Sequence, residues 1–175
     1  GLGHDPWGGS RGLWRALNPL SPGLIRVEAD ELSYGLHIVL RFELELALLE
    51  QGLPVAELPD AWNRGMQELL GLRPANDAEG CLQDVHWTEG AFGYFPSYTL
   101  GAMYAAQWFA AIRRKTPDLD ACIARGDLKP VFGWMGKNIW SQASLWPTPE
   151  LVQRASGEAL NPQHFRRHLE QRYIK

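Results

Sequence analysis

The sequence predicts a mainly α-helical protein, and three observations support this fold class. Apolar residues recur three and four positions apart along most of the chain, whereas strict alternation of apolar and polar residues is rare. Proline and glycine stand where helices begin and end. With 175 residues, of which 45% are hydrophobic, the chain is long enough to bury a core without disulfides or a structural metal.

The first elements in chain order are well delimited by their flanking residues. The glycine-rich residues 1–12 are expected to form a flexible segment, and residues 13–175 one helical domain. A long helix is predicted over Ser21–Leu49, because proline stands near its entry and a glycine and a proline follow its end. A second, amphipathic helix is predicted over Leu58–Leu70, because its apolar residues share one face and Gly71 follows.

The remaining elements are also helical, apart from one ambiguous stretch. Residues 81–87 alternate apolar and polar side chains, which predicts either a short strand or an extended loop. Further helices are predicted over residues 97–115, 119–125, 131–139, 148–155 and 161–173.

Composition and charge exclude several classes of protein. The chain has 17 basic and 20 acidic side chains, a net charge of 17 − 20 = −3, so it lacks the basic surface that nucleic-acid binding requires. We expect no nucleic-acid partner, no signal peptide and no membrane span. The two cysteines, Cys81 and Cys122, are expected to be small buried apolar side chains in a cytoplasmic protein.

The predicted helix over Ser21–Leu49 carries a polar stripe on an otherwise apolar cylinder. Buried charges must be paired or must face a polar cavity. One interpretation is an internal network of salt bridges at helical spacing, and the other is a helix that lines a substrate cleft and offers a guanidinium to a carboxylate. The histidine of the stripe is expected to be a core residue. The stripe consists of Arg26, Asp30, Tyr34, His37, Arg41 and Glu45.

A second polar cluster lies between Gly80 and Gly101, among glycines and a proline. It offers neutral hydrogen-bond donors, an imidazole and two phenols, of the kind that stabilise a developing oxyanion. The alternative is that an aromatic, glycine-containing loop serves only packing and turns. The polar residues of this cluster are Gln83, Asp84, His86, Tyr94 and Tyr98.

Two segments carry a resemblance to a known family. IRVEAD, residues 25–30, and GCLQDVHW, residues 80–87, resemble the Ile-Arg-x-x-Ala-Asp and Gly-x-x-Gln-Asp-x-His-Trp signatures of the carboxypeptidase Taq family of zinc metallopeptidases. The resemblance extends over about residues 13–175 and matches the last third of that family. It implies the helical C-terminal portion of a gluzincin-type metallopeptidase.

The resemblance also implies what this chain lacks. The family binds zinc through a His-Glu-x-x-His helix and a later glutamate, and no such motif is present in the sequence. The nearest string, from His164 to His168, has Phe165 at the position of the glutamate and is expected to be a surface helix. We therefore expect no metal ligand in this chain, with zinc or another divalent metal such as cobalt bound by a missing N-terminal part.

Roles for individual residues follow from the resemblance. Arg26 would bind the free C-terminal carboxylate of the substrate. His86 and Tyr94 would be catalytic donors to the substrate backbone or the oxyanion. Gln83 and Tyr98 would contact substrate, and Asp84 would orient His86. Asp30 would support Arg26, and a salt bridge between Arg26 and Asp30 is also the alternative to substrate binding.

The implied whole enzyme removes single residues from the C-termini of peptides and forms a homodimer. As a C-terminal fragment without the zinc site, this chain is expected to be inactive alone. The alternative is a non-catalytic helical module that binds peptides or a partner protein.

Overall fold

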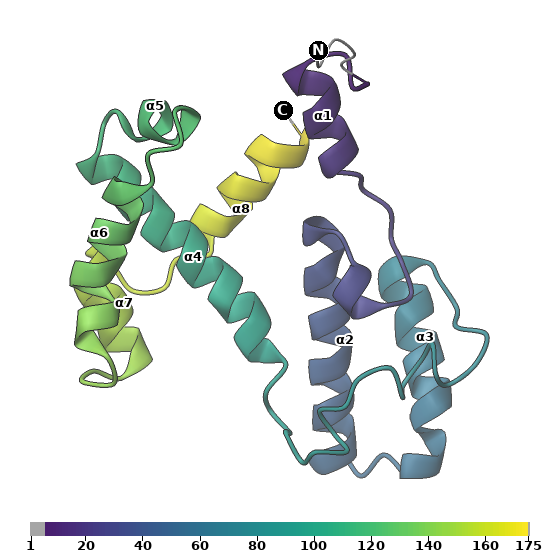
Figure 1. Cartoon of the computed structure of the whole chain (residues 1–175). Helices are drawn as coiled ribbons and strands as arrows, with labels where there is room; N and C mark the ends of the chain where they lie inside the picture. Colours follow the sequence, from purple (N-terminus) through teal and green to yellow (C-terminus); the bar gives the residue numbers. More distant parts are fainter. Residues whose placement is uncertain (1–5, 175) are drawn as a thin grey trace. The chain divides into compact units, whose positions relative to one another are not determined.

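A computed structural model describes residues 6–174, and all of its regular structure within that range is helical (Figure 1). The chain forms two compact units, one ending at Ser97 and the other beginning at Tyr98. The mainly α-helical fold class predicted from the sequence is confirmed. Residues 81–87 form turns rather than a strand.

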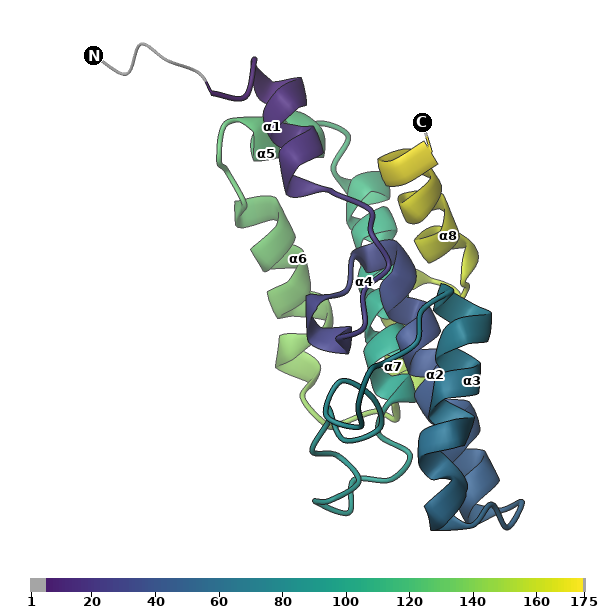
Figure 2. The same ribbon diagram turned by 90° about the vertical axis from the view of Figure 1, so that its right-hand side faces the viewer.

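The first unit contains three α-helices and two short 3-10 helices. Helix α1 spans Ser10–Leu17, α2 spans Glu31–Leu49 and α3 spans Leu58–Leu70; the 3-10 helices η1 and η2 span Arg26–Glu28 and Val55–Glu57. Helices α2 and α3 lie side by side, as both views show (Figures 1 and 2). Helix α1 was not predicted; it begins inside the segment expected to be flexible, and residues 1–5 lie outside the described range.

The predicted helix over Ser21–Leu49 is wrong at its start, because Asp30 caps α2. The Asp30 Oδ1 accepts hydrogen bonds from the backbone N–H groups of Leu32 and Ser33 at 3.0 and 2.8 Å. An N-cap residue has extended rather than helical dihedrals, so the helix starts only at Glu31. Residues 26–28 form the separate helix η1, and the polar stripe is therefore divided between two elements.

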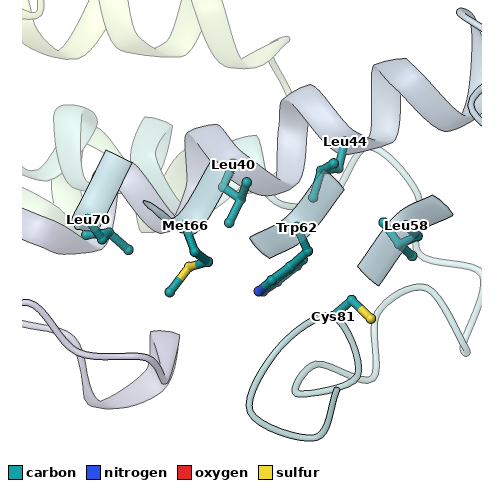
Figure 3. Packing of buried hydrophobic residues seen from close by; sticks show 7 residues of the cluster. All are labelled: Leu40, Leu44, Leu58, Trp62, Met66, Leu70 and Cys81. Atoms are coloured by element: carbon teal, nitrogen blue, oxygen red, sulfur yellow. The ribbon is translucent and has the colours of Figure 1, made fainter. Parts of the chain in front are cut away.

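The core of the first unit lies between α2 and α3 (Figure 3). Trp62 and Met66 on α3 are almost completely buried against Leu40 and Leu44 on α2. A side chain at Gly65 would collide with Leu40, so glycine allows the two helices to approach closely. Cys81, from the loop after α3, packs in the same core, and its predicted burial is confirmed.

Helix α3 has the predicted bounds and ends as predicted. Gly71 adopts the left-handed conformation, with φ 71°, and its N–H donates to the carbonyl of Gln67. Glycine reaches this conformation without steric penalty, and it satisfies a carbonyl at the end of the helix.

The second unit has its own helices and core. Its helices are α4 (Pro96–Lys115, which begins two residues before the boundary), α5 (Leu119–Ala124), α6 (Lys129–Asn138), α7 (Thr148–Ser156) and α8 (Gln163–Leu169), with the 3-10 helix η3 (Trp140–Gln142) and the π-helical turn η4 (Glu170–Ile174). Each predicted helix of this region is present with small shifts of its ends. Ala111, Ile112, Leu119, Trp134 and Ala155 form the core, and Cys122 is buried as predicted.

A buried glutamine fixes the connection between α7 and α8. Gln107 is completely buried, and its Nε2 donates to the Ser156 Oγ at 2.8 Å and to the carbonyls of Glu158 and Ala159. Its Oε1 accepts from the N–H of Asn161 at 2.8 Å. One side chain thus satisfies the backbone of a segment that has no regular structure.

The core predicts how leucines on α2 differ in their contribution to stability. Leu40→Ala should lower the free energy of unfolding by about 2–5 kcal/mol, because Leu40 is 2% exposed and its truncation leaves a cavity. Leu49→Ala, on the same helix at 60% exposure, should change it by less than ~1 kcal/mol. Chemical denaturation of both variants measures the difference, and equal losses would contradict this account of the core.

Candidate functional site

The candidate site is built where the loop after α3 contacts η1 and α2, and Asp84 is at its centre. The Asp84 Oδ1 accepts from Arg26 Nε at 3.0 Å and from Arg26 Nη2 at 2.7 Å. The Asp84 Oδ2 accepts from Arg41 Nε, and Arg41 Nη2 also lies 2.6 Å from this oxygen. One carboxylate therefore joins two arginines from different helical elements, and all three side chains are at most 10% exposed.

Arg26 is held on every side by protein groups. Its Nη1 donates to the Tyr34 hydroxyl at 2.8 Å, and its backbone N–H donates to the Gln83 Oε1 at 2.9 Å. The guanidinium also lies over the ring of Phe95, with its central carbon 5.8 Å from the ring centroid. Its partner is Asp84 rather than Asp30, the partner considered at helical spacing.

Gln83 holds the loop to the segment before α2. Its Nε2 donates to the carbonyls of Leu24, Glu79 and Gly80 at 3.1, 2.9 and 3.2 Å. Since its Oε1 accepts from Arg26, the whole amide is engaged with backbone groups. The geometry therefore gives Gln83 a positioning role, and its predicted contact with substrate stays a prediction.

His86 and Tyr94 form the more accessible part of the site. Their ring centroids lie 5.8 Å apart, so one small group of a bound molecule can contact both rings. The His86 side chain is 13% exposed and its ring lies 4.3 Å from that of the buried Phe95, whereas Tyr94 is 51% exposed. The His86 Nδ1 is 3.9 Å from the Asp84 Oδ1, which is beyond hydrogen-bond distance but within reach of its charge.

The two arginines determine the charge state of the cluster. Burial alone would raise the pKa of Asp84, but the hydrogen bonds and charges of Arg26 and Arg41 hold that pKa below its ordinary value. Burial lowers the pKa of Arg41 to about 10, against the opposing effect of Asp84, so Arg41 is charged at neutral pH. Asp84 thus neutralises one of two guanidinium charges and leaves one positive charge in the cluster.

His37 is buried behind the cluster, as the sequence predicted for a core residue. It is fully inaccessible to solvent, and the Arg41 Nη1 donates to its backbone carbonyl at 2.9 Å. Burial, together with the charge of Arg41, lowers the pKa of the imidazole to about 4, although a backbone contact with Gly23 opposes the shift. His37 is therefore neutral in the folded protein at neutral pH.

Asp30 caps a helix and Tyr98 lies in the second unit, so neither residue is part of the cluster around Asp84. The Asp30 carboxylate caps α2 and also accepts from the N–H of Ser21 at 3.1 Å. Although burial opposes it, these backbone hydrogen bonds lower the pKa of Asp30. Tyr98 lies in α4, at the start of the second unit, and its contact with substrate stays a prediction.

Arg41 and Glu45 belong to the predicted polar stripe, but no role in the site was predicted for either residue. Arg41 pairs with Asp84, and Glu45 accepts hydrogen bonds from Trp87 Nε1 and the N–H of Gly93. Their helical spacing was a usable signal for burial. It could not identify partners that lie 42 to 48 residues away in the sequence.

The described part of the chain offers no metal centre of its own. Within residues 6–174, no group of three or more His, Cys, Asp or Glu side chains is arranged to hold a metal ion. His164, part of the nearest sequence string, instead contacts Glu158, with its Nε2 2.8 Å from the Oε1. Over the same range, no helix has the length and apolar character needed to span a bilayer.

Two solved structures that share this fold are described as a metallocarboxypeptidase and an M32 carboxypeptidase. The chain matches metallocarboxypeptidase 1 of Trypanosoma cruzi with a TM-score of 0.93 and 47% identity, covering 99% of this chain and 36% of that one. It matches an M32 carboxypeptidase of Deinococcus radiodurans R1 with a TM-score of 0.91 and 40% identity, covering 94% and 33%. The chain belongs to the carboxypeptidase Taq (M32) metallopeptidase family, whose model matches residues 9–173.

Sequence relatives agree with this assignment, and they are longer. The chain is 43% identical over 159 residues to carboxypeptidase 1 of Bacillus subtilis (strain 168), covering 91% of this chain and 32% of that protein. It is 44% identical over 158 residues to thermostable carboxypeptidase 1 of Thermus thermophilus, covering 90% and 31%. It therefore spans about a third of the length of these relatives, and the predicted family is confirmed.

The buried cluster predicts that Asp84→Asn is strongly destabilising. The substitution leaves two buried guanidinium groups without an anionic partner, which should lower the free energy of unfolding by about 3–5 kcal/mol. Asp120→Asn is a matched control, because it removes an exposed Arg–Asp pair and should change stability by less than ~1 kcal/mol. Denaturant titration compares the two, and a small effect at Asp84 would contradict the central role of its carboxylate.

His37 predicts a loss of stability in mild acid. The folded protein keeps this imidazole neutral down to about pH 4, whereas the unfolded chain protonates it near 6.5. The unfolded state therefore binds more protons in this window, and stability should fall by up to roughly 3 kcal/mol as the pH decreases from 6.5 to 4. Asp84 contributes to acid sensitivity only below its ordinary pKa of 3.8.

Thermal denaturation of wild type and His37→Leu between pH 4 and 8 tests this sign. The variant should show a flatter pH dependence across the window, because it has no imidazole to protonate. A wild-type stability that stays constant or rises as the solution is acidified would refute the prediction.

Proposed function

We propose that this chain forms one wall of the substrate cleft in a metal-dependent carboxypeptidase that removes single residues from peptide C-termini. Membership of the M32 family carries this proposal. The local geometry supports it, because an exposed tyrosine and a partly exposed histidine lie beside a buried cationic cluster. Such a site suits an anionic substrate and an oxyanion that forms during hydrolysis.

In this proposal Tyr94 and His86 act as hydrogen-bond donors to the reacting peptide. A phenol or imidazole N–H placed at the developing oxyanion stabilises the transition state more than the ground state. Gln83 and Tyr98 are proposed to contact the substrate, although the Gln83 amide is already engaged with backbone groups.

Arg26 is proposed to supply the charge that attracts the terminal carboxylate. Its Nε and Nη2 donate to Asp84 and its Nη1 donates to Tyr34, so a substrate meets a guanidinium that the protein has already oriented. The two arginines and Asp84 together carry one net positive charge, which favours a carboxylate bound nearby. Asp84 is proposed to orient His86 through its charge, and Asp30 to support Arg26 indirectly by capping α2.

The remaining properties of the whole enzyme are also proposals. The metal, zinc or another divalent ion such as cobalt, would be held by residues outside those described here, because the described residues present no ligand cluster. Alone, this chain would be inactive. The whole enzyme would be a cytoplasmic homodimer, and the two buried free thiols agree with a reducing compartment.

A non-catalytic helical module that binds peptides or a partner protein is the second candidate. The lack of a metal-ligand cluster in residues 6–174 favours it. A chimaera in which residues 9–173 replace the matching third of Bacillus subtilis carboxypeptidase 1 separates the two functions. Release of the last residue from peptides with a free C-terminal carboxylate, but not from C-terminally amidated peptides, supports the carboxypeptidase. A folded, metal-loaded chimaera without activity supports the binding module.

Tyr94→Phe in the chimaera tests the oxyanion role. Removing the hydroxyl should lower kcat about 100-fold and change KM less than ~2-fold, because the interaction is made mainly in the transition state. Tyr104→Phe, in α4, is a matched control that should leave both constants unchanged. Steady-state kinetics on one peptide substrate measures the effect, and a change confined to KM would argue against this role.

A further inference from the structure

Glu45 is a buried carboxylate that the proposed chemistry does not use. It lies on α2 and is 3% exposed. Its Oε1 accepts a hydrogen bond from the Trp87 Nε1 at 2.8 Å, and its Oε2 accepts one from the backbone N–H of Gly93 at 3.2 Å. The two oxygens therefore bind the loop at two points, Trp87 and Gly93.

These two points are the immediate neighbours of the two candidate donors. Trp87 follows His86 directly in the sequence, and Gly93 directly precedes Tyr94. Between them the chain turns back on itself, because the N–H of Ala91 donates to the carbonyl of His86 at 2.8 Å. Gly93 has φ 74°, a left-handed conformation that other residues rarely adopt, so its N–H is aimed by a specific backbone geometry.

Packing alone does not fix this turn. None of residues 88–94 is buried, and the first buried side chain after the turn is that of Phe95. Trp87 is additionally held by edge-on contacts with the rings of Trp62 and Phe95, at centroid distances of 6.2 and 6.0 Å. Gly93 has no side chain of its own to pack, so its hydrogen bond to Glu45 is what links this point of the turn to α2.

We propose that Glu45 is a positioning residue that sets the separation between His86 and Tyr94. The two N–H donors bond different oxygens of the carboxylate, at 2.8 and 3.2 Å, whereas in glutamine an NH2 group replaces one oxygen and sets a donor against a donor, so the longer bond, to Gly93, is the one expected to be lost. Loss of the Gly93 hydrogen bond releases the chain on the N-terminal side of Tyr94, whose carbonyl stays bonded to Ser97, while ring packing keeps Trp87 and His86 in place. The inference deepens the proposed function, since it matters for catalysis only if these two rings act on substrate.

Nuclear magnetic resonance on this chain tests the geometry without any activity. In Glu45→Gln, the amide hydrogen of Gly93 should exchange at least ~10-fold faster, and the nuclear Overhauser effect between the His86 and Tyr94 rings should weaken. Glu43→Gln, an exposed carboxylate on the same helix, is the matched control and should change neither signal. Unchanged Gly93 exchange in a folded Glu45→Gln chain would overturn the proposal.

Trp87→Phe provides a second variant if Glu45→Gln fails to fold. It keeps an aromatic ring but removes the indole N–H, so the Glu45 carboxylate should still protect the Gly93 amide from exchange. Loss of that protection in Trp87→Phe would mean that the tryptophan, and not Glu45, holds this end of the turn.

Kinetics in the chimaera separates this inference from the proposed function. Glu45→Gln should lower kcat about 10- to 100-fold with KM nearly unchanged, and it should have little further effect once Tyr94 is phenylalanine. If the Gly93 end loosens but kcat is unaffected, the positioning role stands and the catalytic role of Tyr94 fails. If neither the exchange rate nor kcat changes, the positioning role fails.

Discussion

Asp84 accepts hydrogen bonds from Arg26 and Arg41, and the arrangement of the first unit depends on this shared carboxylate. Arg26 and Arg41 belong to the neighbouring elements η1 and α2, whereas Asp84 comes from the loop after α3, 58 and 43 residues further along the chain. Desolvating two arginines and one carboxylate is unfavourable unless all three are held in good hydrogen-bond geometry. The cluster therefore stabilises a single arrangement of these segments, because any displacement leaves a buried charge unpaired.

Helix α2 performs two tasks with two of its faces. Leu40 and Leu44 pack against α3 and form the core, while Arg41 and Glu45 hold the polar loop. Because one rigid helix carries both sets of side chains, the packing of the core also fixes the position of the loop. Candidate catalytic groups on a loop gain precision when their supports stand on regular structure.

The sequence predicted local features better than distant pairings. Helix α3 has its predicted bounds, since apolar spacing and Gly71 act over a few residues. The entry to α2 was misplaced because Asp30 was interpreted as a charge in a helical stripe rather than as a cap. The family resemblance named Arg26, His86 and Tyr94, and the structure brings them to one region of the first unit. The engagement of Arg26 by Asp84 and of Glu45 by Gly93 could not be predicted, because helical periodicity reports that a polar group is buried but does not identify its distant partner.

The turn between Trp87 and Gly93 contains no buried residue, and it is attached at both ends to one buried carboxylate. Its side chains, from Thr88 to Phe92, contribute little to the core, so evolution and protein engineering are free to exchange them without unfolding the unit. Substitutions in such a segment can change which ligands it contacts while His86 and Tyr94 keep their positions. The two attached ends thus separate the positions that fix the geometry from those whose side chains can be substituted.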